Sequence, residues 1–317
     1  MIPTLNDIYQ AGNRIHPYIH RTPVLTCTSL NRKVGAQVFL KCENMQKVGA
    51  FKFRGACNAV FSLSKAEASR GVTTHSSGNH AQAIALAARM RGIPAYIVMP
   101  DNASEVKKAT VAGYGGMITF CEPTLEARES TQKQVIRETG AVAIHPYNDY
   151  RIIAGQGTAA IELLQEVPDL DIILAPVGGG GLLSGTAIAA TSLSPGIRVI
   201  GTEPLMADDA YRSLKAGKII PSVNPQTIAD GLRTSLGELT FPIIQQRVEK
   251  ILTVSEAKII SAMKYIWERA KIIIEPSSAV AVGALWEHNS DFAGLRVGII
   301  LSGGNVDLER LPWSQKT

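Results

Sequence analysis

The chain has 317 residues, of which 45% are hydrophobic and 19% charged, so it can bury large cores and we do not expect intrinsic disorder. Its net charge is only +5 and its basic residues are scattered, which disfavours a nucleic-acid-binding face. No charge-free apolar stretch approaches the roughly 20 residues that span a bilayer, and the first residues lack the features of a signal peptide, so we expect a soluble cytoplasmic protein with no membrane partner.

Short apolar runs alternate with helical patterns along the chain. The first strands are predicted at residues 38–41, 71–75, 95–99 and 117–121, with helices at 80–91 and 104–112. Three later runs are continuously apolar, as in strands buried on both faces of a parallel sheet, and they lie at 171–177, 198–202 and 297–301. Strands separated by helices indicate a doubly wound α/β fold, and the length suggests two domains at roughly 150 residues each.

The four cysteines are Cys27, Cys42, Cys57 and Cys121. They form no C-x-x-C pair, and no paired histidines complete a zinc site. We therefore expect reduced, mostly structural thiols, which fits a cytosolic protein.

Lys52 lies between Phe51 and Phe53, just ahead of a helical pattern at residues 56–63. Burial and a helix N-terminus both lower the pKa of an ammonium group below its ordinary value. A neutral lysine is what imine formation with an aldehyde requires. The alternative is a surface lysine whose stem packs beside the aromatic rings, and Lys52 taken alone favours that alternative.

A polar loop with Ser76, Ser77, Asn79 and His80 stands between a predicted strand and a predicted helix. Hydroxyl and amide donors at a helix N-terminus suit a carboxylate, although serine capping of the helix explains the pattern equally well. Ser302 follows the strand at 297–301, where open α/β sheets place ligands, and a simple turn is again the comparable alternative.

The strongest single feature is the run Gly178, Gly179, Gly180 and Gly181 between a strand and a helix. Four glycines allow backbone N–H groups to converge on an anion, and the helix start adds a favourable dipole, so we favour a phosphate cradle over a tight turn. The lysine of a P-loop is missing. A dinucleotide-binding site is less well supported, because Leu183 or Ser184 stands where its glycine motif needs a final glycine or alanine. It is not excluded, because Glu203 at the end of the next strand could bind a ribose.

Together these features resemble the fold-type II pyridoxal-phosphate enzymes, and within them the serine/threonine dehydratase family. The form of the loop with Ser77, where many threonine dehydratases have alanine, is similar to serine racemases and 3-hydroxyaspartate dehydratases. The likeness covers essentially the whole chain, and further shared stretches are residues 21–25, 41–44, 154–158, 229–231, 274–277 and 302–307.

The resemblance implies a role for each matching residue. Lys52 would be joined to the cofactor and then shuttle the α-proton, with Ser77 as a second acid/base on the other side of the substrate. Phe51 would lie along the cofactor ring, Asn79 would bind its 3-oxygen, and Ser302 would face its pyridine nitrogen. Residues 178–181 with Leu182 would hold the phosphate. The substrate would be bound by Ser76, Ser77, Asn79, His80, Arg128 and Ser235.

A divalent-cation loop is also implied, with carboxylates from Glu203 and Asp209 and the backbone carbonyl of Ala207. Oxygen ligands of this kind suit Mg²⁺ or Ca²⁺. Spacing alone favours a solvated acidic loop instead.

We therefore expect two open twisted-sheet domains, with residues 1–65 and 149–317 forming a large cofactor domain and 66–148 a small domain that closes over substrate. The expected reaction removes water and ammonia from 3-hydroxyaspartate or L-serine, less readily from L-threonine, to give a 2-oxo acid. The nearest alternative is a serine racemase using Lys52 and Ser77. β-Replacement, a nucleotide-dependent oxidoreductase and a ligand-binding sensor are weaker alternatives. The group favours homodimers.

Overall fold

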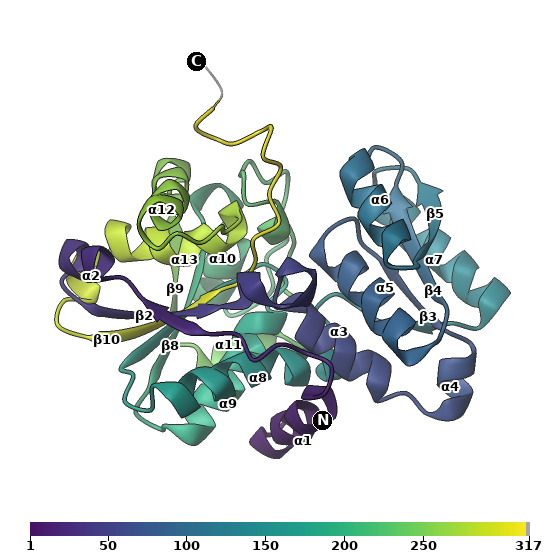
Figure 1. Ribbon diagram of the computed structural model, residues 1–317, viewed down its shortest axis with the longest axis horizontal. Helices are drawn as coiled ribbons and strands as arrows, with labels where there is room; N and C mark the ends of the chain where they lie inside the picture. Colours follow the sequence, from purple (N-terminus) through teal and green to yellow (C-terminus); the bar gives the residue numbers. More distant parts are fainter. Residues whose placement is uncertain (315–317) are drawn as a thin grey trace.

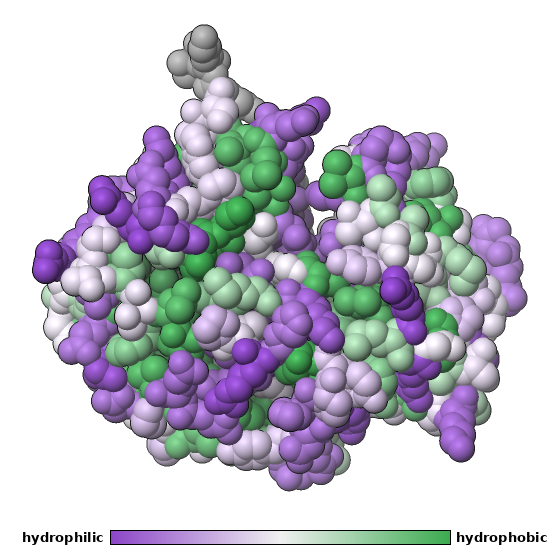
Figure 2. Space-filling view, in the orientation of Figure 1, coloured by the Kyte–Doolittle hydropathy of each residue, from purple (hydrophilic) through white to green (hydrophobic). Residues whose placement is uncertain are grey.

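The computed structural model describes residues 1–314 as two sheets with packed helices (Figure 1). The larger sheet has the strand order β1-β2-β10-β7-β8-β9, and the smaller has the order β5-β4-β3-β6. Neighbouring strands are parallel except for β1 and β2. The sheets occupy the left and right lobes of Figure 1, and Figure 2 shows a notch between these lobes. The expected α/β class with two largely parallel sheets is confirmed.

The larger sheet is covered by helices on both faces because its central strands are apolar on both sides. In β7, Ile172 and Leu174 join a core with helices α12 and α13, whereas Ile173 and Ala175 face a second core with α8 and α9. Its strands are β1 (Val24–Thr26), β2 (Gln37–Cys42), β7 (Ile172–Pro176), β8 (Arg198–Pro204), β9 (Lys250–Val254) and β10 (Arg296–Leu301). Its helices are α1 (Leu5–Ile15), α2 (Thr28–Val34), α8 (Tyr150–Glu166), α9 (Gly181–Leu193), α10 (Asp209–Ala216), α11 (Phe241–Arg247), α12 (Glu256–Arg269) and α13 (Pro276–Glu287).

The smaller sheet packs against an alanine-rich helix, α5, whose buried face has small side chains that allow close approach. Its strands are β3 (Val72–His75), β4 (Ala95–Pro100), β5 (Met117–Cys121) and β6 (Val142–Ala143). The helices around it are α3 (Lys52–Phe61), α4 (Lys65–Ser69), α5 (Asn79–Arg91), α6 (Glu105–Gly113) and α7 (Leu125–Thr139). Short 3-10 turns elsewhere are η1 (Glu43–Met45), η2 (Lys47–Gly49), η3 (Leu205–Ala207), η4 (Asp230–Leu232) and η5 (Asn289–Asp291).

The four strands of the smaller sheet all fall inside the predicted small domain, residues 66–148. Helix α3, which the sequence assigns to the large domain, nevertheless packs Phe53, Ala56 and Val60 into the core of the smaller sheet. The boundary positions themselves stay predictions, and residues 315–317 of the predicted large domain lie outside the described residues. None of the helices among residues 1–314 combines the length and apolarity that crossing a membrane requires.

Glycines bring helices α3, α8 and α9 into backbone contact. A Cβ on Gly155 of α8 would lie 2.6 Å from the Cα of Gly55 in α3. A Cβ on Gly185 of α9 would lie 2.6 Å from the backbone nitrogen of Gly157 in α8. Real Cβ atoms do not approach other atoms so closely, so any larger residue would push these helices apart.

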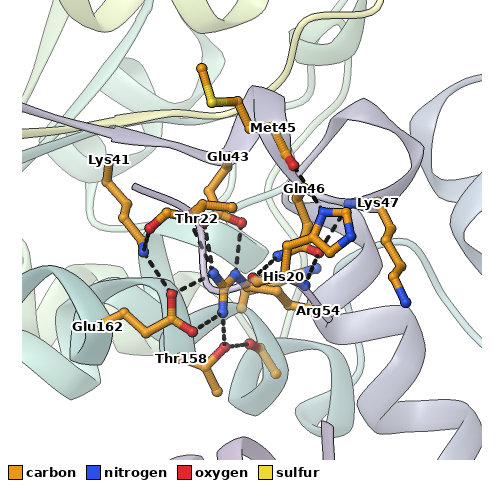
Figure 3. A network of polar contacts seen from close by, with 12 residues as sticks. His20, Thr22, Lys41, Glu43, Met45, Gln46, Lys47, Arg54, Thr158 and Glu162 are labelled. Atoms are coloured by element: carbon orange, nitrogen blue, oxygen red, sulfur yellow. Dashed lines mark hydrogen bonds and ion pairs between the residues drawn. The ribbon is translucent and has the colours of Figure 1, made fainter. Parts of the chain in front are cut away.

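A buried network of charges anchors α3 (Figure 3). Arg54 is fully buried, and it donates to Glu43 from Nε at 2.7 Å and to Glu162 from Nη1 at 2.8 Å. Lys41, also fully buried, donates to Glu162 at 2.6 Å, and the hydroxyl of Thr22 donates to Glu43 at 2.5 Å. The two cations balance the two carboxylates. Buried charges are tolerated only when they are paired in this way, so the network fixes α3 against β2 and α8.

Replacing Arg54 by Leu leaves two carboxylates facing one lysine in a buried site. We expect the free energy of unfolding to fall by about 3–5 kcal/mol, the usual cost of removing one member of a buried ion pair. Urea denaturation of the variant measures this loss. Arg32→Leu, at an exposed position in α2, is the matched control and should change stability by about 0.5 kcal/mol or less. Equal stability of the two variants would contradict the anchoring role.

Candidate functional site

The predicted site residues meet where the carboxyl ends of strands from both sheets face each other. A cavity of about 520 Å³ is lined by Lys52, the loop with Ser76 and Ser77, and Arg128. A smaller cavity adjoins it, since both share Lys52, Asn79 and Gly179 among their lining residues. The remaining predicted cofactor residues all line the smaller cavity, and they are Phe51, Gly178, Gly180, Gly181, Leu182 and Ser302. Parallel sheets place ligands at this edge.

Lys52 is the first residue of α3, and its side chain is half-buried. Its Nζ donates to the backbone oxygen of Pro146 at 2.9 Å and lies 5.1 Å from the centre of the Phe51 ring. Burial lowers the pKa of Lys52 to about 8, against the opposing effect of the nearby Glu275 carboxylate. The uncharged fraction of this amine near neutral pH is therefore much larger than that of an exposed lysine, and the uncharged form is the nucleophilic one.

The glycine run forms a turn that has no room for side chains. Gly180 has a positive φ of 90°, which favours glycine, and it precedes α9. A Cβ on Gly179 would overlap the ring of Tyr147, and one on Gly180 would lie 2.8 Å from the Thr240 hydroxyl. Within residues 1–314, the backbone N–H groups of residues 178–182 donate to no protein acceptor. Five such donors at a helix start are suited to a phosphate.

The loop after β3 presents a second set of backbone donors. Asn79 begins α5, and the N–H groups of Asn79, His80 and Ala81 have no protein acceptor among the described residues. Ser76 and Ser77 are half-buried and line the larger cavity. These free donors and hydroxyls suit a carboxylate.

Three histidines surround this loop, and only His80 was predicted. Its ring is buried with Nε2 near the oxygen of Ile144, and burial holds its pKa well below the ordinary value. His145 accepts the N–H of Asn148 at Nδ1, 2.9 Å away, and burial lowers its pKa to about 4. His75 lies beside His145, with ring centres 6.0 Å apart, and burial lowers its pKa too. The histidines are therefore neutral at physiological pH.

Arg128 and Ser235 both line the larger cavity, Arg128 from α7 and Ser235 from the segment after η4. The guanidinium of Arg128 donates to the backbone oxygen of Thr124 at 3.2 Å and forms no ion pair with a carboxylate in the described part of the chain. The hydroxyl of Ser235 accepts the N–H of Ser222 at 2.8 Å. Arg128 is thus a cation available to an anionic group in the cavity.

The predicted cation residues lie around the end of β8 and the start of α10. Glu203 accepts the N–H of Ala210 at 3.1 Å, and Asp209 has a buried Oδ2 without a hydrogen-bond partner in the described region. Burial raises the pKa of Glu203 to about 9 and that of Asp209 to about 6. Ala207 is buried beside them in η3. No group of three or more His, Cys, Asp or Glu side chains suited to a metal occurs in residues 1–314, so a cation here would depend on two carboxylates and backbone oxygens.

Several residues that line the two cavities were not predicted as site residues from the sequence, and Glu275, Tyr147 and His145 are three of them. Glu275 and Tyr147 line the smaller cavity with Lys52, and His145 lines the larger one. Glu275 lies in one of the stretches that carry the family resemblance, so its position was marked without a role. Tyr147 and His145 follow β6, a strand of only two residues, so no strand pattern indicated them.

Comparison with known proteins agrees with this geometry. The model of the family described as "Pyridoxal-phosphate dependent enzyme" matches residues 15–303. The chain is 53% identical to a beta-hydroxyaspartate dehydratase of Paracoccus denitrificans, over 99% of both chains. It is 49% identical to an L-threo-3-hydroxyaspartate ammonia-lyase of Saccharomyces cerevisiae, over 98% of this chain and 95% of the relative.

The fold comparison gives the same result. The crystal structure of serine racemase from Dictyostelium discoideum superimposes with a TM-score of 0.92 and 53% sequence identity, covering 96% of this chain and 99% of that one. The resemblance predicted from the sequence is thereby confirmed over nearly the whole length. The chain belongs to the family of pyridoxal-phosphate-dependent enzymes.

Proposed function

We propose that this chain is a pyridoxal-phosphate-dependent ammonia-lyase that eliminates water from 3-hydroxyaspartate or L-serine. The observation that carries the proposal is the half-buried amine of Lys52, with a pKa lowered to about 8, placed between a glycine turn and a polar loop. The names of the Paracoccus and yeast relatives support the choice of 3-hydroxyaspartate.

The residues of the smaller cavity fit the cofactor. The free N–H groups of residues 178–182 would bind its phosphate, where a Cβ would block the approach. Phe51 would lie along its ring, and Asn79 would bind its 3-oxygen. Ser302, which is 3% exposed, would face the ring nitrogen with an uncharged hydroxyl. When bound, the cofactor supplies an electron sink that acidifies the α-hydrogen of an attached amino acid.

The chain's own residues would position the substrate and move its proton. The N–H groups at the start of α5 and the hydroxyls of Ser76 and Ser77 would bind the α-carboxylate. The uncharged Nζ of Lys52 would take the proton from Cα. Loss of the β-hydroxyl as water then gives an enamine, which hydrolyses to a 2-oxo acid and ammonia.

Arg128 supports a substrate with a second carboxylate. Its guanidinium lines the same cavity as Ser77 and has no carboxylate partner among the described residues. A bidentate bridge from arginine to a carboxylate is strong and directional. Ser235, which lines the same cavity, would add a hydroxyl to the substrate-binding site.

Racemisation is the second candidate function, and Ser77 is the observation that favours it. A racemase needs one acid/base on each face of Cα, and Ser77 lines the cavity that Lys52 also lines. The 52% identity to a serine racemase of Dictyostelium discoideum supports this activity as well.

We further propose a divalent cation, Mg²⁺ or Ca²⁺, at Glu203, Ala207 and Asp209. The unpartnered buried oxygen of Asp209 supports it, because a buried carboxylate oxygen requires a donor or a cation.

Three broader expectations also remain proposals: a small domain that closes over the substrate, a homodimer and a cytoplasmic location. All four cysteines are free thiols, which fits a reducing compartment.

The proposed reaction is tested by incubating the purified holoenzyme with 3-hydroxyaspartate, L-serine and L-threonine and measuring 2-oxo acid and ammonia. We expect equimolar products, fastest from 3-hydroxyaspartate, without added thiol. Lys52→Ala should lower the rate by about 10³-fold or more, since it removes the base. If L-serine gives D-serine but no pyruvate, the protein is a racemase and the proposed lyase activity is wrong. Full activity in Lys52→Ala would refute both.

Gly179→Ala tests the phosphate cradle. The added Cβ would overlap the ring of Tyr147, and overpacking of this kind costs about 1–3 kcal/mol. We therefore expect the affinity for pyridoxal phosphate to fall by about 5- to 150-fold, measured by absorbance titration of the cofactor-free protein. Gly196→Ala is the control, because a Cβ there meets no atom within 4 Å. Unchanged affinity in Gly179→Ala would contradict the cradle.

Arg128→Ala tests the second carboxylate. A hydrogen bond to a charged group contributes about 1.5–3 kcal/mol, so kcat/KM for 3-hydroxyaspartate should fall by about 10- to 150-fold. The value for L-serine, which lacks the second carboxylate, should change by about threefold at most. Arg137→Ala, at an exposed position on the same helix, is the control. An equal fall in kcat/KM for the two substrates would contradict a role of Arg128 in selecting a substrate with a second carboxylate.

A further inference from the structure

The side-chain amide of Asn79 is held on both sides by groups from the other sheet. Its Nδ2 donates to the two carboxylate oxygens of Glu275 at 3.0 and 3.2 Å. Its Oδ1 accepts from Nδ2 of Asn305 at 2.8 Å. Asn79 begins α5 beside the smaller sheet, whereas Glu275 precedes α13 and Asn305 follows β10 of the larger sheet. The contact therefore joins the two lobes at the cofactor cavity.

The partners also determine which way the amide of Asn79 points. The backbone carbonyl oxygen of Val48 can only accept hydrogen bonds, and it accepts one from Nδ2 of Asn305 at 2.7 Å. Asn305 must therefore present its second N–H to Oδ1 of Asn79. A reversed Asn79 amide would place N–H against N–H on one side and oxygen against the Glu275 carboxylate on the other. The network allows one orientation only.

Glu275 is suited to hold this orientation. Glu275 is 6% exposed, and its carboxylate accepts the backbone N–H of Asn305 at 3.1 Å in addition to the amide of Asn79. Burial raises the pKa of Glu275 to about 7, so above this pH the group is ionised and acts only as an acceptor. Oδ1 of Asn79 accepts from Asn305 and Nδ2 carries two N–H groups, so the amide can direct one N–H of Nδ2 to the cavity.

We propose that Glu275 and Asn305 are positioning residues that fix Asn79 as a hydrogen-bond donor toward the 3-oxygen of pyridoxal phosphate. This inference rests on the proposed function. A fixed N–H donor stabilises an ionised oxygen over a neutral hydroxyl, because its dipole is already aligned with the negative charge. Glu275 and Asn305 would thereby favour the ionised over the neutral form of the cofactor's ring oxygen.

The visible spectrum of the resting holoenzyme near pH 8 reports this balance without turnover. The ionised form absorbs in the violet and the neutral hydroxyl form in the near ultraviolet. Glu275→Leu and Asn305→Ala should each lower the ratio of the two bands by about tenfold, the effect of one charge-assisted hydrogen bond. Glu275→Gln should retain the ratio to within about threefold, because its amide oxygen still accepts from Asn79.

Asn44→Ala is the matched control. Asn44 donates to the backbone oxygen of Ile273 at 2.9 Å and so tethers the same segment without touching Asn79. Its spectrum should equal that of the wild type. Cofactor content, measured after release by alkali, normalises every spectrum, and if Glu275→Leu fails to bind cofactor the Asn305→Ala comparison decides.

Wild-type spectra in loaded Glu275→Leu or Asn305→Ala would overturn the positioning role while leaving the proposed function intact. Equal changes in Asn44→Ala would also overturn it, since a loosened segment would then explain the effect. A wild-type protein that takes up no cofactor would instead refute the proposed function itself.

Discussion

The burial of Arg54 between two carboxylates is the interaction on which the position of the reactive amine depends. Arg54 lies two residues after Lys52 on α3, a separation of about 3 Å along a helix axis. Its partners Glu43 and Glu162 come from the end of β2 and from α8, so both support elements belong to the larger sheet. A helix held by paired charges cannot shift without exposing them to an apolar interior. The amine is therefore fixed relative to the glycine turn.

The site combines this rigid half with a second half on the smaller sheet. Lys52, the glycine turn and Ser302 belong to the part anchored on the larger sheet, whereas Ser77 and Asn79 follow β3. The chemistry that we propose needs both halves, because an amine must face an α-carbon whose carboxylate is bound by the loop. In the proposed function the larger-sheet part would make most contacts with the cofactor and the smaller-sheet part most contacts with the substrate, while Asn79 would contact both.

Most of the fold, and the proposed site residues that meet at the two cavities, could be predicted from the sequence because their signals are local. The glycine run and the polar loop each lie between an apolar strand and a helical pattern, and Lys52 lies between two aromatic residues just before a helical pattern. Glu275 received no role because its function arises from a contact with Asn79, 196 residues away. Tyr147 was missed for the same reason, since its ring fills the space above Gly179. Contacts between residues far apart in the chain produce no periodic pattern in the sequence from which they could be predicted.

The backbone contacts among α3, α8 and α9 have a consequence for the order of folding. Arg54 meets Glu162 across 108 residues, and Gly55 packs against a helix from the same distant segment. Closing so long a loop costs conformational entropy before any contact offsets it. During synthesis α3 can therefore pack on α5 and the smaller sheet first, whereas its contact with α8 forms only after residue 166 has been made. The ion pair of Arg54 with Glu162, which fixes the end of α3 that carries Lys52, is therefore completed late in synthesis.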